Sequence, residues 1–455
     1  MTSHENRLKR RDFLQKSVAG AAMAGLVTVP RHVLGGAGHT PPSEKVNMAF
    51  IGVGNRGWQL IRGMRPEHRG MADQNVVVLC DVDAKYLAEA AGHFEKAKTY
   101  RDFRRMLDAE NKTIDAVVVA TPDHVHVPAS VMAMKMGKHC YTEKPLGHNI
   151  HEVRTATQVA RRYGLATQLG NTGHSGHNYR GVVELIKAGT IGKVREVHAW
   201  CDNEWETPPR VVGALRSRNR PQGTPPVPEY LAWDLWLGPA PYRPYHPAYH
   251  PRHWRGWWDF GNGRLGDMGC HLIDLPFSAL DLKYPLTVEA KGPPAHPESA
   301  PPWLISTWTF PGRGDRPPVE LTWYDGNKRP ELLKEVDPPD SNWPWYVLFV
   351  GADGMLIAGI ESFKLYPEDK FAGVRRPPLP RGPSHAEEWL TACKTGSPTG
   401  CHFGYSGPLT ETVLLGTVAH RAGRKLEWDA QDMKVTNCPE ANQFVRREYR
   451  QGWTL

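Results

Sequence analysis

Residues 46–62, which read VNMAFIGVGNRGWQLIR, decide the fold. An apolar run leads into a Gly-x-Gly-x-x-Gly hexad and then into a segment with helical character. In a strand–turn–helix unit the first glycine permits the tight turn, the second lets the backbone approach a pyrophosphate, and the third allows the helix to pack closely on the strand. The phosphates would lie at the amino end of the helix, where N–H groups and the helix dipole favour negative charge. The residues predicted to line this site are Gly52, Gly54, Asn55, Arg56 and Gly57.

A second apolar strand, residues 75–80, ends at Asp81. Asp81 follows the hexad at close to the spacing, roughly 20 residues, at which an acidic residue binds the ribose hydroxyls of a dinucleotide. Because a carboxylate there repels a 2′-phosphate, the sequence favours NAD over NADP. Arg56 leaves some doubt about this preference for NAD, since an arginine can bind the 2′-phosphate of NADP. The alternative is a sheet of this kind without a ligand, in which Asp81 caps a helix.

Helices and strands then alternate, as in a parallel α/β sheet. We expect helices over residues 84–97 and 128–137, and strands over residues 114–120 and 139–142. In an open α/β sheet, ligand chemistry collects in the loops at the carboxyl ends of the strands. The residues of these loops that we assign to cofactor binding are Thr121, Pro122, Asp123, His126, Glu143 and Lys144.

Three motifs follow one another in this half of the chain: the glycine-rich hexad, Thr-Pro-Asp-x-x-His at residues 121–126, and Glu-Lys-Pro at residues 143–145. In this order and at these intervals they resemble the glucose–fructose oxidoreductase / inositol dehydrogenase / MocA (Gfo/Idh/MocA) family. The likeness covers most of the chain and is strongest from Val46 to about Val197. The Glu-Lys-Pro motif is the most specific of the three.

The resemblance implies an α/β fold class. It predicts an N-terminal Rossmann dinucleotide-binding domain and a C-terminal α+β domain with a largely antiparallel sheet that serves substrate binding and subunit contacts. We expect a leader over residues 1–40 and the two domains over residues 41–170 and 171–455. In the family the matching lysine contacts the nicotinamide ribose and the substrate, which makes Lys144 a catalytic candidate. The alternative is a solvated surface lysine.

Residues 266–274 carry a second set of reactive side chains. Asp267, His271 and Asp274 would share one face of a helix. We expect Asp267 to orient the imidazole of His271, which would act as a general base near neutral pH. The alternative is a capping aspartate and a buried histidine, but Asp-x-x-x-His resembles the second catalytic motif of the family. The residues assigned to substrate binding are Asn171, His174, Trp257 and Asp274.

Aromatic residues crowd the Pro/Gly-rich passage 207–265. Twelve of the sixteen tryptophans fall between Trp200 and Trp345. Because aromatic rings stack on the apolar faces of sugars, one interpretation is a carbohydrate platform that includes Trp257. The other is that the rings fill a sheet core or an oligomer interface. The sequence does not decide between the two.

Neither the histidines nor the cysteines of the chain predict a metal site. His246, His250 and His253 have suggestive spacing, but intervening prolines break the helix that would align them. The seven cysteines are odd in number and lack Cys-x-x-Cys spacing, so we expect free, buried thiols rather than disulfides or zinc.

The formal net charge of +8 is concentrated at the start of the chain. Residues 1–35 hold six Lys/Arg and two Asp/Glu, which is half of the excess. The remainder has no basic run that could follow a phosphate backbone, so the sequence argues against nucleic-acid binding.

The first thirty residues read as a targeting signal. Lys9-Arg10-Arg11 precedes an apolar stretch at residues 17–30 that is too short to span a bilayer comfortably. Adjacent arginines followed by Phe-Leu resemble a twin-arginine (Tat) signal. We therefore expect export to the periplasm by the Tat machinery, cleavage between Val33 and Thr40, and no membrane span in the mature protein. The alternative is a basic amphipathic helix.

Taken with the resemblance, these residues predict an NAD-dependent oxidoreductase that acts on a secondary alcohol of a sugar, cyclitol or glycoside. The Tat route carries folded proteins, so the cofactor would be bound tightly before export. A homo-oligomer is expected from the family. Two alternatives stay open: a glycosidase that works by transient oxidation and elimination, whose members generally lack Glu-Lys-Pro, and a sugar-binding protein without catalysis.

Overall fold

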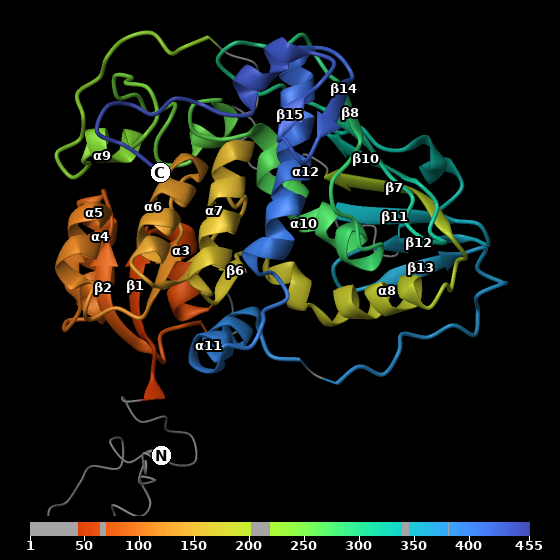
Figure 1. Ribbon diagram of the computed structural model, residues 1–455, viewed down its shortest axis with the longest axis horizontal. Helices are drawn as coiled ribbons and strands as arrows, with labels where there is room; N and C mark the ends of the chain where they lie inside the picture. Colours follow the sequence, from red (N-terminus) through yellow and green to blue (C-terminus); the bar gives the residue numbers. More distant parts are fainter. Residues whose placement is uncertain (1–43, 64–69, 202–218, 339–344, 381) are drawn as a thin grey trace, which may run out of the picture. The chain divides into compact units, whose positions relative to one another are not determined.

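The computed structural model describes residues 44–63, 70–201, 219–338, 345–380 and 382–455. The predicted leader at residues 1–40 lies outside these ranges. Residues Val46–Leu455 form one compact unit with two sheets (Figure 1). The expected division between residues 170 and 171 falls inside this unit and stays a prediction. Among the helices of the described ranges, none has the length and apolar character needed to cross a bilayer.

The first sheet is parallel and has the strand order β3-β2-β1-β4-β5-β6. Its strands are β1 (Asn47–Ile51), β2 (Asn75–Cys80), β3 (Lys98–Tyr100), β4 (Ala116–Val119), β5 (His139–Thr142) and β6 (Thr167–Leu169). β1 and β4 are central and almost wholly apolar, as strands covered on both faces must be. The order places β2 on one side of β1 and β4 to β6 on the other, which confirms the Rossmann-type domain.

Helices cover both faces of this sheet because alternate residues of each strand point to opposite sides. Met48 and Phe50 of β1 pack with the apolar residues of α3 and α4, whereas Ala49 and Ile51 pack with those of α5, α6 and α7. These helices are α3 (Asn55–Arg62), α4 (Ala84–His93), α5 (Phe103–Glu110), α6 (Asp123–Lys135) and α7 (Ile150–Tyr163). The strand ends that carry the predicted loops are thereby held in a rigid three-layer frame.

The second sheet is largely antiparallel, as expected, with the order β13-β12-β11-β7-β10-β9-β8-β14-β15. The β7–β10 pair at its centre is parallel, and the other pairs are antiparallel. Its strands are β7 (Val194–Cys201), β8 (Thr287–Lys291), β9 (Ile305–Phe310), β10 (Val319–Asp325), β11 (Trp345–Gly351), β12 (Met355–Ala358), β13 (Phe363–Tyr366), β14 (Leu426–Asp429) and β15 (Lys434–Val435).

The long helix α10 (Gly263–Ala279) links the second sheet to the reactive edge of the first. It is buried along most of its length between α8 (His177–Lys187), α12 (Phe403–Ala422) and the strands β7 and β11 (Figure 1). The remaining helices are α9 (Trp233–Leu237), α11 (His385–Thr395) and the 3₁₀ turns η2 (Thr172–Ser175), η5 (His253–Gly256), η6 (Glu331–Lys334) and η7 (Pro439–Phe444). Burial on several sides fixes where α10 directs its polar residues.

Helix α6 begins at Asp123, five residues before the predicted start at Pro128. Proline inside a helix removes the hydrogen bond to the carbonyl four residues earlier. Here that carbonyl belongs to His124, and Arg447 satisfies it with an Nη2–O distance of 3.1 Å. α12 likewise begins at Phe403, before Pro408. Both helices are buried nearly all round, so the periodic pattern that marks a helix boundary is missing.

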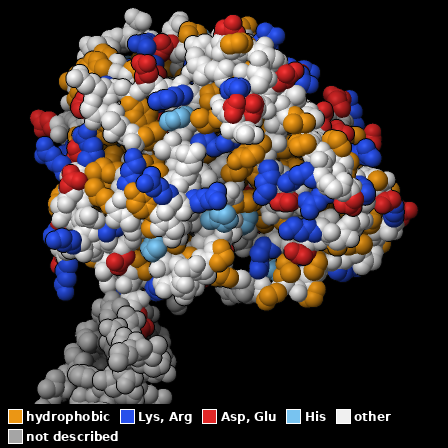
Figure 2. Space-filling model, in the orientation of Figure 1, with side chains coloured by type: hydrophobic (Ala, Val, Ile, Leu, Met, Phe, Trp, Pro, Cys, Tyr) orange, Lys and Arg blue, Asp and Glu red, His pale blue; other side chains and the backbone are white. Residues whose placement is uncertain are grey.

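Charged side chains on the face shown in Figure 2 are mixed, with Lys and Arg among acidic and apolar groups. Opposite charges pair here: Lys434 binds Asp432 at the surface (2.6 Å), and the exposed Lys98 binds the buried Glu110 (2.8 Å). The face in view therefore carries charges of both signs together with apolar groups.

Candidate active site

The polar loops predicted from the sequence meet at one edge of the first sheet. Because β4, β5 and β6 are neighbours, the loops that begin at Thr121, Glu143 and Gly170 follow one another along this edge. Helix α10 reaches the same place: Lys144 Nζ donates to both the backbone oxygen and Oδ1 of Asp267, each at 2.6 Å. The Glu-Lys-Pro loop and the Asp-x-x-x-His helix are therefore in direct contact.

The glycine-rich turn has the shape of a phosphate cradle. Gly52 has φ +84°, and a Cβ there would lie 2.6 Å from the carbonyl oxygen of Ala120. A Cβ on Gly57 would lie 1.9 Å from the oxygen of Gly52. α3 follows Gly54 with neither a side-chain cap nor an acidic residue in its first turn. Its amino end can thus face an anion, which fits the pyrophosphate of a dinucleotide.

Asp81 lies beside this turn at the end of β2. Its Oδ2 accepts hydrogen bonds from the backbone N–H of Val53 (2.8 Å) and Gly54 (3.4 Å), and its Oδ1 accepts one from Asp83 (2.8 Å). Burial raises the pKa of Asp81, although these bonds oppose the shift. The first-turn N–H groups of α4 are capped by Asp83, not Asp81. A carboxylate at this position is suited to ribose hydroxyls and disfavours a 2′-phosphate.

Arg56 points away from the adenosine side of the turn. Its Nε donates to Oε1 of Glu143 at 2.8 Å. Glu143 follows β5, on the opposite side of β1 from Asp81. Burial disfavours the charged guanidinium, but the Glu143 carboxylate outweighs this and raises the pKa of Arg56. The reservation that Arg56 might select NADP is therefore removed, because the side chain is already paired on the other side.

The side chain of His126 connects the loop at Thr121 with the loop at Pro145. Its Nε2 lies 2.8 Å from the carbonyl oxygen of Thr121, and its Nδ1 lies 2.7 Å from that of Pro145. The ring is 1% exposed, so it cannot touch a ligand directly. Pro122 provides the extended residue before α6, and its carbonyl accepts a bond from Thr121 Oγ1 at 3.2 Å. The buried ring of His126 thus shapes the loop and does not face a ligand, whereas the assignment of the half-buried Pro122 to cofactor binding stays a prediction.

Asp123 is a buried carboxyl group at the start of α6. It is 4% exposed, and burial raises its pKa to about 8 even though Lys144 and Arg255 act in the opposite direction. At neutral pH this carboxyl is therefore mostly protonated and adds no negative charge beside Lys144. A neutral carboxylic acid can donate a hydrogen bond to a ligand oxygen.

Replacing Asp123 by asparagine is expected to change stability in a pH-dependent way. The unfolded chain ionises this group above about pH 4, whereas the folded chain holds the proton up to about pH 8. The contribution of Asp123 to folding stability therefore falls as pH rises from 4 to 8. The quantity to compare is the melting temperature of Asp123→Asn minus that of the wild type. This difference should be larger at pH 9 than at pH 5 by about 2 °C or more. An equal difference at both pH values would contradict the assignment, and the exposed Asp108→Asn serves as control.

Lys144 and Asp267 form a three-membered cluster with Arg255. Arg255 Nε lies 3.1 Å from Asp267 Oδ1, the oxygen that also accepts from Lys144. Burial favours the neutral form of Asp267, but the two cations hold its pKa well below its usual range. Asp267 is thus ionised at any working pH and fixes the position of the Lys144 ammonium.

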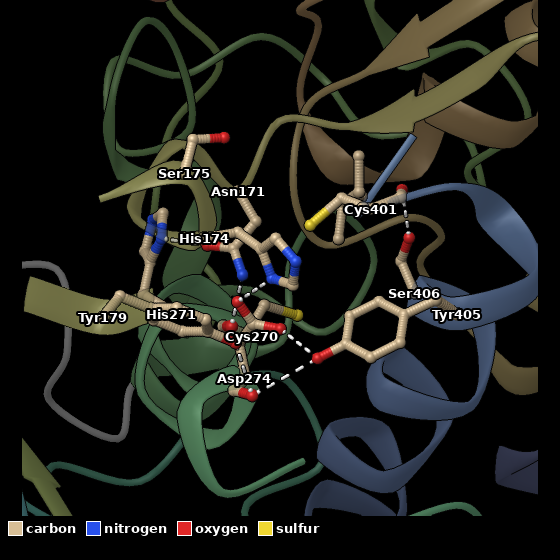
Figure 3. Close-up of polar contacts among 12 residues, drawn as sticks. Asn171, His174, Ser175, Tyr179, Cys270, His271, Asp274, Cys401, Tyr405 and Ser406 are labelled. Atoms are coloured by element: carbon tan, nitrogen blue, oxygen red, sulfur yellow. Dashed lines mark hydrogen bonds and ion pairs between the residues drawn. The ribbon is translucent and has the colours of Figure 1, made fainter. Parts of the chain in front are cut away.

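His271 is oriented by Asn171, not by Asp267. His271 Nδ1 lies 2.7 Å from Asn171 Oδ1, and Asn171 Nδ2 donates to the carbonyl oxygen of Cys270 at 2.9 Å (Figure 3). That carbonyl can only accept, so the amide must present its oxygen to the imidazole. Nδ1 then carries the proton and Nε2 is left as an acceptor. The expected Asp267–His271 couple is therefore wrong, because Lys144 and Arg255 occupy the carboxylate.

The charge state of His271 also differs from the prediction. Burial lowers its pKa to about 3, and the positive charge of Lys144 acts in the same direction. His271 is consequently neutral at pH 7 and does not titrate near it. Asp267 raises this pKa, but the other effects outweigh it.

His174 and Asp274 form a separate hydrogen-bond network behind His271. His174 Nδ1 lies 2.9 Å from Asp274 Oδ2, and the Tyr405 hydroxyl donates to Asp274 Oδ1 at 2.5 Å (Figure 3). The His174 ring lies between Tyr179 (5.0 Å between centroids) and Tyr405 (5.3 Å). Asp274 is fully buried. Its assignment to substrate binding is corrected, since both carboxylate oxygens already have partners and no face reaches a ligand.

The same network holds the group with metal-ligand spacing found in the described part of the chain. Ligand atoms of His174, Asp274 and Cys401 lie within 4.8 Å of one another. Burial raises the pKa of the Cys401 thiol well above its ordinary value, so the thiol is protonated in the protein without a metal. Hydrogen bonding between His174 and Asp274 accounts for this arrangement without an ion.

Trp257 lies in a closed aromatic cluster and not on a sugar platform. The ring is 1% exposed, packs against Tyr249 at 5.0 Å, and donates from Nε1 to the carbonyl oxygen of Ala248 at 2.8 Å. Trp236 and Phe260 complete the cluster core at 4.8 Å from each other. Of the two interpretations left open by the sequence, core filling is the one that the structure supports for Trp257.

Two arginines near the site were missed. Arg255 contacts Asp267, and Arg252 Nη2 lies 3.3 Å from Asn55 Oδ1 in the glycine-rich turn. Both belong to the segment around η5, whose sequence carries no motif. Asn171 was assigned to substrate, but the structure makes it the positioning partner of His271. No periodicity or spacing in the sequence signals these contacts.

Two family models of the Gfo/Idh/MocA group match the chain. The model described as "Oxidoreductase family, NAD-binding Rossmann fold" matches residues 46–171. The model described as "Oxidoreductase family, C-terminal alpha/beta domain" matches residues 216–313.

Curated relatives share the first part of the chain. A "Glycosyl hydrolase family 109 protein" from Saccharopolyspora erythraea is 31% identical over 216 residues, and an "Alpha-N-acetylgalactosaminidase" from Shewanella oneidensis is 24% identical over 213 residues. In both cases the match covers 42% of this chain and 45% of the relative. The chain therefore spans less than half the length of these relatives.

Solved structures match most of the chain at low identity. The WlbA dehydrogenase from Bordetella pertussis, in complex with NADH and UDP-GlcNAcA, has TM-score 0.57 and 15% identity, covering 85% of this chain and 99% of that one. A levoglucosan dehydrogenase in complex with NADH has TM-score 0.56 and 15% identity, covering 84% and 98%. These likenesses establish the fold.

Proposed function

We propose that the chain is an NAD-dependent oxidoreductase of the Gfo/Idh/MocA family that acts on a secondary alcohol of a sugar, cyclitol or glycoside. Two family models support this proposal: the NAD-binding Rossmann fold matches residues 46–171, and the C-terminal alpha/beta domain matches residues 216–313. One observation carries the proposal. Lys144, in the loop after β5, contacts Asp267 of α10 at 2.6 Å, and Asp267 lies about one helical turn before His271, whose imidazole is neutral. A fixed ammonium and an unprotonated ring nitrogen are what alcohol oxidation requires.

His271 takes the hydroxyl proton in this proposal. Asn171 holds the proton on Nδ1, so Nε2 can accept one from the substrate hydroxyl. As the carbon gives up its hydrogen with the bonding pair, the C–O bond becomes a carbonyl and the proton stays on His271. In the reverse direction the imidazolium returns that proton to the oxygen.

Lys144 stabilises the oxygen that becomes negative during this step. Its ammonium is held by two bonds to Asp267, which in turn is held by Arg255. A preformed cation beside the developing alkoxide needs no reorganisation when the charge appears. Because Asp123 is protonated at neutral pH, it does not add a second negative charge beside the Lys144 ammonium.

The residues for the cofactor are those of the first sheet. Gly52, Gly54 and Gly57 shape the cradle, the amino end of α3 would hold the phosphates, and Asp81 would bind the ribose. When bound, NAD supplies the hydride acceptor for the reaction.

A second candidate function is supported by the relatives named as family 109 glycosyl hydrolases. In that alternative the same residues would oxidise the sugar only transiently, before the aglycone leaves and water adds. The two candidates are separated by one paired assay. The protein is supplied with NAD and a panel of free sugars and chromogenic glycosides, and both nicotinamide reduction and aglycone release are followed.

Net nicotinamide reduction with an oxidised sugar as product supports the oxidoreductase. Aglycone release without net reduction supports the glycosidase. Ligand binding with neither change would favour a non-catalytic sugar-binding protein and would contradict both catalytic proposals.

We also propose that the protein is exported by the Tat route with its cofactor already bound. Support comes from Arg10-Arg11 and the apolar stretch after them, which lie outside the described residues. Replacing both arginines by lysine should leave the folded protein in the cytoplasm, as measured by cell fractionation. Export of the double variant at the wild-type level would contradict this. A homo-oligomer is likewise proposed from the family, and the mass of a single chain in light scattering would contradict it.

A further inference from the structure

A segment from outside the Rossmann domain is fastened beside the ribose-binding acid. The N–H of Ala84 donates to the oxygen of Tyr230 at 2.8 Å, and the N–H of Ala232 donates to the oxygen of Val82 at 3.0 Å. Arg101 Nη2 donates to the carbonyl oxygens of both Val82 and Tyr230, at 2.5 and 2.8 Å. The chain at residues 230–232 is thus locked to the loop that directly follows Asp81.

The aromatic cluster connects this anchored segment to the residues around η5, which contact the glycine-rich turn. Trp233 and Trp236, immediately after the anchor, are stacked at 4.7 Å, and Trp233 packs edge-on against Tyr245 at 5.3 Å. Tyr249 packs against Trp257 on the far side of η5. The residues between, including His250 to Gly256, are therefore held from both ends by buried rings. The tryptophans of this passage therefore fix a short turn that carries Arg252 and Arg255.

This turn carries two arginines, Arg252 and Arg255, whose side chains contact different parts of the protein. Arg255 contacts Asp267 at the catalytic end. Arg252 reaches the opposite end, where its Nη2 lies 3.3 Å from Oδ1 of Asn55, the first residue of α3. In the part of the chain that the structure describes, Arg252 has no carboxylate within ion-pair distance. Its charge is therefore not neutralised by the protein there.

The place that Arg252 reaches already favours an anion. Asn55 stands at the amino end of α3, directly after Gly54, where no acidic side chain caps the helix. Asn55 Nδ2 also donates to the Tyr86 hydroxyl at 3.2 Å, so Asn55 is held between Tyr86 and Arg252. A guanidinium at hydrogen-bond distance from the first helical residue can bind a phosphate held on that helix end with two parallel N–H bonds.

We propose that Arg252 binds the pyrophosphate of NAD and so completes the phosphate site from outside the Rossmann domain. The inference rests on the proposed function only in requiring that NAD is bound. It adds a cofactor-binding residue that the glycine-rich motif does not contain. It also gives a physical route to tight cofactor retention, because the arginine is fixed by the anchored aromatic segment.

The test compares binding of two ligands to purified full-length protein by calorimetry. ADP-ribose has the pyrophosphate, whereas adenosine has only the base and ribose. Arg252→Ala should weaken ADP-ribose and NAD by about ten- to hundredfold, the usual loss for a charge-assisted hydrogen bond, and leave adenosine within about twofold. Arg252→Lys keeps the charge but loses the planar fork of the guanidinium, so its affinity for ADP-ribose should lie between those of the wild type and Arg252→Ala. Arg375→Ala is the matched control, since Arg375 is exposed and bonds only carbonyl oxygens of its own turn among the contacts described.

Unchanged ADP-ribose affinity in Arg252→Ala, in a wild type that binds NAD, would overturn this inference and leave the proposed function standing. Equal weakening of ADP-ribose and adenosine would also overturn it, because the effect would then come from loss of the anchored segment and not from a phosphate contact. A wild-type chain that binds no NAD would overturn the proposed function and this inference together.

Discussion

Lys144→Ala is expected to lower turnover by about a hundred- to a thousandfold, the usual cost of removing a preorganised group that stabilises an oxyanion. The structure gives the reason: the ammonium is fixed by two 2.6 Å contacts to Asp267, so a solvent water cannot take its place with the same geometry. The measurement is kcat with a responsive sugar at saturating NAD. Affinity for NAD, measured separately, should change by less than about tenfold, because the residues proposed to hold the pyrophosphate and the adenosine ribose lie elsewhere and Lys144 would lose only its contact to the nicotinamide ribose.

Stability separates this effect from misfolding. Asp267 retains Arg255 in the variant, so its carboxylate is not left unpaired and the folded state should persist. Lys135→Ala, which removes an exposed lysine at the end of α6, is the matched control and should behave as wild type. Near-normal turnover in a folded Lys144→Ala protein would contradict the catalytic assignment.

His271→Ala is the second variant with a large expected effect, a loss of about a hundred- to ten-thousandfold in turnover, as for removal of a general base. His271→Gln should lose as much activity, because its amide can still donate to Asn171 Oδ1 but has no basic nitrogen. The exposed His93→Ala is the control. A folded His271→Gln enzyme with more than about a tenth of wild-type turnover would contradict the role.

The pH dependence of the wild type tests the state of this histidine. Protonation at Nε2 would abolish its ability to accept the substrate proton, so activity is lost when pH falls through the pKa. Because burial lowers that pKa to about 3, oxidation should not decline between pH 7 and about pH 5 on account of His271. An ordinary histidine would cause a decline near pH 6.5. A titration of that kind that disappears in His271→Gln would show that the imidazole is not buried as described.

Much of the fold could be predicted because local pattern and tertiary environment agree. The strands Asn75–Cys80 and His139–Thr142 have the predicted bounds. The glycine-rich turn was recognisable because only glycine tolerates its close approaches. Helix α6 was placed too late, because a helix buried on all sides has no polar face to mark its start and Arg447 compensates for the internal proline.

The site was predicted by residue type but not by partner. Helical spacing places Asp267 and His271 on one face, yet it does not determine which side chains from elsewhere will bond them. Lys144 bonds Asp267 and Asn171 bonds His271, and each of these partners lies more than 90 residues from the side chain that it bonds. Composition likewise signalled the aromatic passage without deciding between a surface and a core. Trp257, the aromatic residue assigned to substrate binding, is buried and therefore belongs to the core.

The most direct test of the account is a near-ultraviolet absorbance and fluorescence spectrum of wild-type protein, purified without dialysis and supplemented with one equivalent of NAD if none is bound. The spectrum is recorded before and after each member of a panel of sugars, cyclitols and glycosides is added. The account predicts a reduced-nicotinamide signal that appears with one class of polyol and is absent in Lys144→Ala and His271→Gln. No bound nicotinamide, no uptake of added NAD and no response to any member of the panel would contradict hydride transfer as the function of this site.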